Sequence, residues 1–232
     1  MRKLVLAVLV AMAASIPPAW ADFTGQFELV DNPGGKDGKL KKLKYPFGYN
    51  DNKGYGWEAR AGLETDGASI PLWAQPFIGG PYDEQYIKAA VLHDHYCDRH
   101  VYGWRQTHRM FYDVLLELKV PKIKAGIMYG AVMIGGPKWE RVEPGEKCKA
   151  TQNCIRTFTG AASVMILNVR PAIYGGMTDL DQRLHTLEQR LSAMKEHSVD
   201  DIDAIARQLA PENEYLFRPD VIHVEAVSYP TR

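Results

Sequence analysis

The spacing of apolar residues changes along the 232-residue chain. In its middle part, apolar side chains recur every three to four residues over residues 83–101 and again over residues 104–118. This spacing predicts two helices joined by the turn at residues 102–103, because each helix would then have one apolar face. A third apolar segment follows Pro121 and ends at the breakers 135–137, which predicts a third core helix after this helix hairpin.

Shorter apolar segments precede the helices and alternate with turn residues. The segments Phe27–Val30, Leu40–Tyr45 and Tyr55–Ala61 are separated by sequences rich in Asn, Asp and Gly at 32–35 and 51–54. Such alternation is typical of strands joined by hairpins. We therefore expect a small N-terminal antiparallel β-sheet packed on the helix hairpin, and an α+β fold class.

Leucines at helical spacing mark the last third of the chain. They run through residues 179–196 among charged side chains, after a β-prone stretch that ends at Val169, and they predict an amphipathic helix. This leucine stripe fits either docking onto the preceding domain or self-association through residues 180–194. A further short helix is expected from Ser198. We thus predict a mainly helical C-terminal extension over residues 146–232.

The first 21 residues have the composition of a secretory signal peptide. Two basic residues precede an apolar run over residues 4–16, and Ala19-Trp20-Ala21 has the small-residue pattern of a cleavage site. The run is shorter than the roughly 20 residues that span a bilayer, which argues against a membrane anchor. We expect a periplasmic or secreted protein that begins at Asp22, has its first domain at 22–145 and has no transmembrane segment after cleavage.

The charge balance bears on the kind of partner. The chain carries 28 basic and 28 acidic residues, and removal of Arg2 and Lys3 would leave the mature protein slightly acidic. It therefore lacks the basic excess that is expected of a nucleic-acid-binding protein. A hydrophobic content of 46% is sufficient for a sizeable core. We expect a folded protein without a nucleic-acid partner.

The cysteines allow two interpretations. Cys148 and Cys154 enclose a short polar loop and are expected to form a local disulfide in an oxidising compartment. Cys97 is then left over, and a buried structural thiol is the simplest interpretation of it. The alternative is a zinc site made of His93, Cys97 and His100, which recur at i, i+4 and i+7.

Titratable residues of the hairpin and of a glycine-containing loop are candidates for chemistry. Asp66 precedes Gly67, where the backbone can turn a carbonyl toward a cation. His93 and Asp94 fall in the gap of the apolar stripe on the first helix, and His108 shares the inner face of the second. We expect Asp66, His93, Asp94 and His108 to converge in one pocket between the loop and the helix hairpin.

The order of these motifs resembles a phage and bacterial domain family, domain of unknown function number 1353. The resemblance rests on Thr65-Asp66-Gly67-Ala68-Ser69-Ile70-Pro71 after a sheet, then Leu92-His93-Asp94, Phe111, Met128-Tyr129 and Trp139, and it covers about residues 26–141. The family label implies no reaction.

The loop and the hairpin also resemble, over about fifty residues, the prokaryotic type of secreted phospholipase A2. That resemblance implies a calcium site at Asp66, the Gly67 carbonyl and Asp94, with His93 as the catalytic base and His108 in the position that orients it. Two positions depart from the pattern. His108 replaces an acidic residue and cannot stabilise a charged imidazole, and Cys97 replaces an aromatic residue.

We therefore expect an exported, metal-assisted hydrolase that acts on a lipid or ester. Calcium would bind the ester carbonyl, while His93 takes a proton from water. One alternative is a non-catalytic envelope or phage-derived structural protein, in which the cluster of His and Asp only stabilises the fold. Another is a zinc hydrolase that uses His93 and His108 with Asp66 or Asp94.

Overall fold

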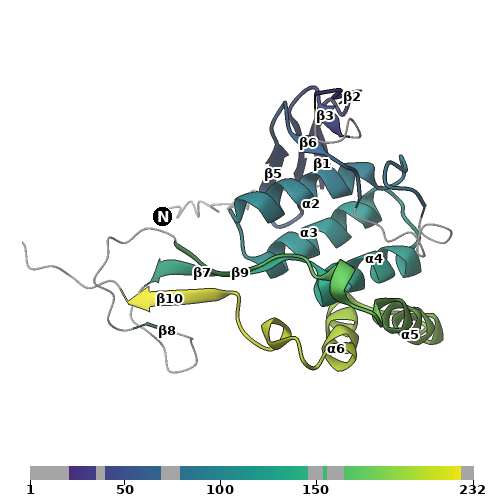
Figure 1. The fold of residues 1–232 in the computed structure, drawn as a ribbon, viewed down its shortest axis with the longest axis vertical. Coiled ribbons are helices and arrows are strands. Elements are labelled where there is room, and N and C mark those ends of the chain that lie inside the picture. Colours follow the sequence, from purple (N-terminus) through teal and green to yellow (C-terminus); the bar gives the residue numbers. More distant parts are fainter. Residues whose placement is uncertain (1–20, 35–39, 69–78, 146–153, 156–164, 226–232) are drawn as a thin grey trace, which may run out of the picture.

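The computed structural model describes residues 21–34, 40–68, 79–145, 154–155 and 165–225 (Figure 1). Its mixture of helices and mostly antiparallel strands confirms the α+β class. In Figure 1 the N-terminal strands lie beside α2, on the side away from α4, while α5 and α6 lie beside α4. The signal peptide that we predict falls outside the described residues, apart from Ala21.

The N-terminal strands form two small antiparallel sheets, although the sequence predicted one. The first has the order β1-β4-β5 and the second the order β2-β3-β6. Gly25, at φ +76°, ends β1, and Pro46, which lacks a backbone N–H, separates β3 from β4. The strands are β1 (Asp22–Gly25), β2 (Leu29–Asp31), β3 (Lys41–Leu43), β4 (Phe47–Asn50), β5 (Gly56–Ala59) and β6 (Glu64–Thr65).

The helix hairpin and the third core helix are confirmed. They are α2 (Ile87–Arg99), α3 (Trp104–Glu117) and α4 (Lys122–Gly135). The helix α2 begins later than the expected residue 83, because the Asp83 side chain accepts a hydrogen bond from the backbone N–H of Gln85 at 2.9 Å. That bond favours a turn over a first helical turn.

The leucine stripe packs inside the molecule. It lies on α5 (Leu180–Ala193), and its members Leu180, Leu184, Leu187 and Leu191 are at most 3% exposed. The helices α5 and α6 (Val199–Leu209) both pack on α4. Gly126 permits this contact, since a Cβ added there would lie 2.9 Å from a methyl carbon of Leu191. Docking is thus what the stripe does in this chain, and self-association stays a prediction.

A third sheet joins strands from both sides of the boundary that we predicted between residues 145 and 146. Its order is β8-β10-β7-β9, with β10 parallel to both of its neighbours and β9 antiparallel to β7. The division into domains stays a prediction. The remaining elements are β7 (Lys138–Gly145), β8 (Cys154–Ile155), β9 (Met165–Arg170), β10 (Val221–Glu225) and the short 3-10 helices η2 (Tyr174–Gly176) and η3 (Glu214–Leu216).

Residues near the C-terminus hold the start of α3. Its N-cap residue, Gly103, has no side chain that could accept a hydrogen bond, and a carboxylate oxygen of Asp220 instead accepts from the backbone N–H of Arg105 at 3.1 Å. Asp220 lies directly before β10. The same carboxylate fills the space that a Cβ at position 103 would need. A distant residue therefore caps the helix that carries His108.

A buried charge network connects α3, α4 and α6. Arg109 on α3 contacts Asp203 on α6 at 2.7 Å, and the Tyr129 hydroxyl on α4 donates to the same carboxylate at 2.6 Å. Asp203 is 3% exposed, so it needs both partners. The network fixes the three helices relative to one another. Within the described ranges, no helix is long and apolar enough to cross a membrane.

Candidate functional site

Two buried histidines meet between α2 and α3. Nε2 of His93 lies 2.9 Å from Nδ1 of His108, and the two residues are 6% and 0% exposed. His93 points inward because Ala90 and Cys97, on its side of α2, are buried as well. His108 shares the buried face of α3 with Phe111 and with a leucine one turn further on. The hairpin thus brings two imidazole rings into direct contact.

Cys97 adds a sulfur atom to this pair. It follows His93 by one helical turn, and its Sγ lies 3.4 Å from Nε2 of His93. The donor atoms of His93, Cys97 and His108 all lie within 4.8 Å of one another. We call these three residues the His-Cys-His cluster. The prediction that Cys97 is a free and buried thiol is confirmed, whereas Cys148 lies outside the described residues and the disulfide stays a prediction.

Burial keeps two members of the cluster neutral. It raises the pKa of the Cys97 thiol well above its usual value of 9.0, and the negative charges of Asp94 and Asp98 act in the same direction. Burial also lowers the pKa of His108 well below 6.5, helped by His93 and Lys138 and opposed by the backbone carbonyl of Pro137. Near neutral pH the cluster therefore presents a thiol and a neutral His108 ring.

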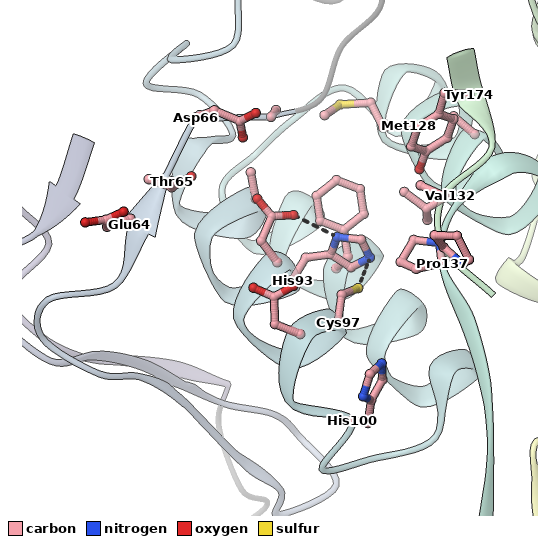
Figure 2. A pocket seen from close by; sticks show the side chains of 18 of the residues that line it. Glu64, Thr65, Asp66, His93, Cys97, His100, Met128, Val132, Pro137 and Tyr174 are labelled. Atoms are coloured by element: carbon pink, nitrogen blue, oxygen red, sulfur yellow. Dashed lines mark hydrogen bonds and ion pairs between the residues drawn. The ribbon is translucent and has the colours of Figure 1, made fainter. Parts of the chain in front are cut away.

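The cluster forms part of the wall of a cavity of about 580 Å³ (Figure 2). His93 and Cys97 line this cavity, whereas His108 lies behind them and has no exposed surface. Figure 2 shows Glu64 and Asp66 on one side of His93 and Met128, Val132 and Tyr174 on the other. The size is in the range of small-molecule sites.

Asp94 lines the cavity beside the cluster. One of its carboxylate oxygens lies 3.6 Å from Nδ1 of His93, and 39% of its side chain is exposed. Burial of the carboxyl group raises its pKa. His93 opposes that increase, and Asp66 and Asp98 add to it. Asp94 is thus a carboxyl group with an increased proton affinity beside His93.

The five predicted site residues have different positions. Asp66, His93 and Asp94 line the cavity, and His108 reaches it only through His93. Gly67 is not among the residues that line it. Its φ of +86° and the carbonyl of Pro81, 2.5 Å from where a Cβ would lie, explain why glycine is needed there. The loop is fixed to Pro81, whose carbonyl also accepts from the N–H of Ala68 at 2.8 Å.

His100 does not join His93 and Cys97 in the structure. It ends α2 in the left-handed conformation at φ 53°, and its ring packs against that of Trp139 at a centroid distance of 4.6 Å. The nitrogen ligand nearest to His93 and Cys97 instead comes from His108 on α3. Of the two zinc alternatives, the set of His93, Cys97 and His100 contains two of the clustered residues, and the zinc hydrolase alternative contains the pair His93 and His108, but neither contains all three.

Sequence comparisons place the chain within a family. Residues 41–132 match the family described as "Protein of unknown function (DUF1353)". The chain is also 42% identical over 190 residues to "Uncharacterized protein y4iH" of Sinorhizobium fredii (strain NBRC 101917 / NGR234), which covers 82% of this chain and 79% of that protein. The chain belongs to the DUF1353 family. The DUF1353 match contains the whole His-Cys-His cluster together with Asp66 and Asp94.

A second relative shares a smaller part. "Uncharacterized protein y4jT" of the same organism is 35% identical over 133 residues, which cover 56% of this chain and 40% of that protein. The DUF1353 description and the two relatives' names state no reaction, substrate or metal. No solved structure matches the chain.

Proposed function

We propose that the protein is an exported, metal-dependent hydrolase whose metal is zinc or a similar transition metal, bound by the His-Cys-His cluster. The observation that carries this proposal is the convergence of two imidazole nitrogens and one sulfur within 4.8 Å at the wall of a cavity. Nitrogen and sulfur donors suit zinc, whereas calcium is bound by oxygen.

The distances in the cluster fit such an ion. Zinc binds nitrogen at ~2.0–2.1 Å and sulfur at ~2.3 Å, so a tetrahedral site separates two nitrogens by roughly 3.3 Å and a nitrogen from a sulfur by roughly 3.6 Å. The corresponding distances here are 2.9 Å, between His93 and His108, and 3.4 Å, between His93 and Cys97. The third pair, Sγ of Cys97 and Nδ1 of His108, lies within 4.8 Å, so side-chain shifts of up to about an ångström would accommodate the ion.

The surroundings of the two histidines also fit. A histidine that binds a metal through one ring nitrogen usually donates its other N–H to a carboxylate or a backbone carbonyl. Asp94 lies beside Nδ1 of His93. His108 offers Nδ1 to the cluster, its Nε2 has no hydrogen bond among the residues described, and the carbonyl of Pro137 acts on the same ring. His93 therefore has a carboxylate on the side away from the ion, and His108 has a buried ring nitrogen there without a hydrogen bond in the described part of the chain.

Three protein ligands leave a fourth position, which is typical of catalytic rather than structural zinc. A bound ion would supply Lewis acidity and a water of lowered pKa. In this proposal Asp94 orients His93. It also takes a proton from the attacking water while the water oxygen bonds to the acyl carbon. Asp94 then returns that proton to the oxygen or nitrogen that leaves when the acyl bond breaks.

A calcium-dependent hydrolase of the phospholipase A2 type is the second candidate. The observation that favours it is the shared cavity of Asp66, Asp94 and His93, in which the charge of Asp66 raises the pKa of Asp94. There, Asp66, the Gly67 carbonyl and Asp94 would hold calcium, and His93 would be the base. In this scheme the contact of His93 Nε2 with His108 would be the orienting contact, and Nδ1 of His93, beside Asp94, would accept the proton of water.

Metal analysis of matched histidine variants tests the proposal. We expect about one zinc per purified chain, and a 10–100-fold or greater loss of zinc affinity in His93→Gln, estimated roughly from changes around known sites. His95→Gln is the control, since His95 lies on the same helix, is 5% exposed and is not in the cluster. Equal zinc affinity in the two variants would refute the zinc site.

The variant His108→Asp distinguishes the calcium scheme from the zinc scheme. The calcium scheme predicts faster ester hydrolysis, because the substitution restores the acidic residue of the phospholipases. The zinc scheme predicts lower zinc affinity, because a nitrogen ligand is lost. A protein that binds neither ion and hydrolyses no ester, in any variant, would support the structural alternative instead.

A further inference from the structure

The cavity has two chemically different sides. Apolar side chains of α4 and α5 form one of them, namely Met128, Val132, Leu180 and Leu184. The other carries the carboxylates of Glu64, Asp66, Asp94 and Asp98, from β6 with its following loop and from α2. His93 and Cys97 lie between these sides (Figure 2). A ligand that fills the cavity would therefore contact both sides across the cluster.

In the described part of the chain, no positively charged side chain compensates the acidic side. Lysine and arginine do not occur among the described residues that line the cavity, and the ion pairs found in this part of the chain include none between its carboxylates and a lysine or arginine. Glu64 has only a neutral partner in the described chain, the amide of Asn32 at 2.7 Å.

A bound metal would not reverse this balance. A divalent ion with the Cys97 thiolate adds one net positive charge, against four carboxylates on the acidic side. Low-dielectric walls strengthen the field inside such a cavity. A cation is therefore attracted to this side, and an anionic headgroup is repelled. The opposite side favours an apolar chain, since covering it removes apolar surface from water.

We propose that the ligand of the cavity is an amphiphilic cation, an apolar chain joined to an amine or ammonium group. The chain lies against α4 and α5, and the cation lies against Glu64, Asp66 and Asp98. This inference rests on the proposed function for one further step: the bond that is cut lies between the two parts, next to the His-Cys-His cluster. The substrate class is then an acyl ester or amide of an amine-bearing alcohol or amine.

Binding of three probes with the same chain tests the ligand class without any reaction. Decyltrimethylammonium, decanol and decyl sulfate are titrated calorimetrically into the mature protein below their micelle concentrations. We expect the ammonium to bind about tenfold more tightly than the alcohol, with a preference that weakens as salt is added. Decyl sulfate should bind most weakly. Equal affinities for the ammonium and the sulfate would overturn the proposal.

Charge-neutralising variants locate the cation. Asp98→Asn and Glu64→Gln should each weaken the ammonium several-fold and leave decanol unchanged, as expected for loss of one exposed charge. Glu84→Gln is the control, because Glu84 is exposed and does not line the cavity. The same loss of affinity in Glu84→Gln would show a general charge effect and contradict the assigned position.

Metal-free and zinc-loaded protein are compared so that the two proposals can fail separately. Preference for the ammonium without any zinc binding would refute the proposed function and support the ligand class. Zinc-dependent hydrolysis of p-nitrophenyl decanoate and decanoylcholine with equal kcat/KM, together with no preference among the probes, would support the proposed function and refute the ligand class. We expect a higher kcat/KM for decanoylcholine, reduced by Asp98→Asn for that substrate alone.

Discussion

Lys138 carries an amino group into the core beside the cluster. It is 1% exposed, donates to the backbone carbonyl of Gly136 at 2.9 Å and lies 5.2 Å from the ring centre of Trp104. Burial lowers its pKa from 10.5 to about 7, and the positive charges of Arg170 and Arg105 act in the same direction. A buried lysine of this kind makes stability depend on pH.

Replacing Lys138 with Met should flatten that dependence. The unfolded chain keeps the lysine proton up to about pH 10.5 and the folded chain only up to about pH 7, so the unfolded state binds more protons between these values. The stability of the wild type should therefore rise with pH from 7 to 9, relative to the variant, by up to roughly 1.4 kcal/mol per pH unit. Urea unfolding of both proteins at pH 7, 8 and 9 measures this, and parallel profiles would contradict it.

The sequence indicated which residues carry chemistry better than which of them meet. His93, Asp94 and His108 could be predicted because helical spacing determines which face a residue occupies. The partner of Cys97 could not be chosen from that spacing. His100 lies on the same helix as Cys97 and satisfied a local pattern. Whether His108 meets Cys97 depends on how far α3 is shifted along α2. That shift is set by side-chain packing across the hairpin, which a periodic pattern does not specify.

At the scale of elements, the contact between α4 and α5 depends on a position without a side chain. A Cβ at Gly130 would overlap a methyl carbon of Leu187, and both residues are buried. Gly126 and Gly130 recur at i and i+4 in the sequence, a spacing that predicts a helix face open to close approach by another helix, and the structure confirms this approach. The helix that approaches could not be inferred, because several amphipathic segments share the pattern of α5.

Gly130→Ala should lower the free energy of unfolding by about 1–3 kcal/mol, because the methyl group displaces Leu187 in a packed core. Chemical denaturation measures the effect. In a Leu187→Ala background the same glycine substitution should cost less than in the wild type, since the overlapping atoms are absent. Gly175→Ala serves as the control, as a Cβ there meets nothing within 4 Å. Equal losses in the two glycine variants would contradict the packing argument.

The start of α6 depends on a capping box. The Ser198 hydroxyl accepts from the N–H of Asp201 at 3.2 Å, and the Asp201 carboxylate accepts from the N–H of Ser198 at 2.8 Å. Ser198→Ala should therefore destabilise the protein by about 1 kcal/mol. Thermal and urea unfolding of Ser198→Ala should be compared with Ser192→Ala, an exposed position on α5 without a cap. A Ser192 variant as unstable as the Ser198 variant would exclude the capping effect.

At the scale of the whole molecule, strands far apart in sequence join the parts. The strand β10 pairs with β7 more than seventy residues earlier, and the Asp203 network joins three helices. These contacts explain why the sequence predicted the N-terminal strands and the helices better than it predicted how the C-terminal extension joins them. The four strands of this sheet, with their two parallel pairings, correspond only to short apolar segments in the sequence. Strand pairing cannot be inferred from such segments.

Metal binding should stabilise the whole molecule if the proposed site is correct. At a free zinc concentration about a hundredfold above Kd, the stability should rise by about 2.7 kcal/mol, which corresponds to roughly 5–11 °C in Tm for a chain of this size. Thermal unfolding with zinc and with a chelator measures the shift. His93→Gln should show at most about half of this shift, as expected for an affinity loss of tenfold or more, and His95→Gln the full shift, whereas shifts of equal size would point to binding elsewhere.

The cap that Asp220 places on α3 also bears on the order of folding steps during synthesis. A ribosome releases the chain from its N-terminus, so α2 and α3 emerge about a hundred residues before the carboxylate that completes the start of α3. Until then the helix that carries His108 lacks that hydrogen bond, and β7 lacks its partner β10. The final alignment of the two imidazole rings is therefore a late event in folding, which follows synthesis of nearly the whole chain. A nascent chain would accordingly be a poor competitor for metal.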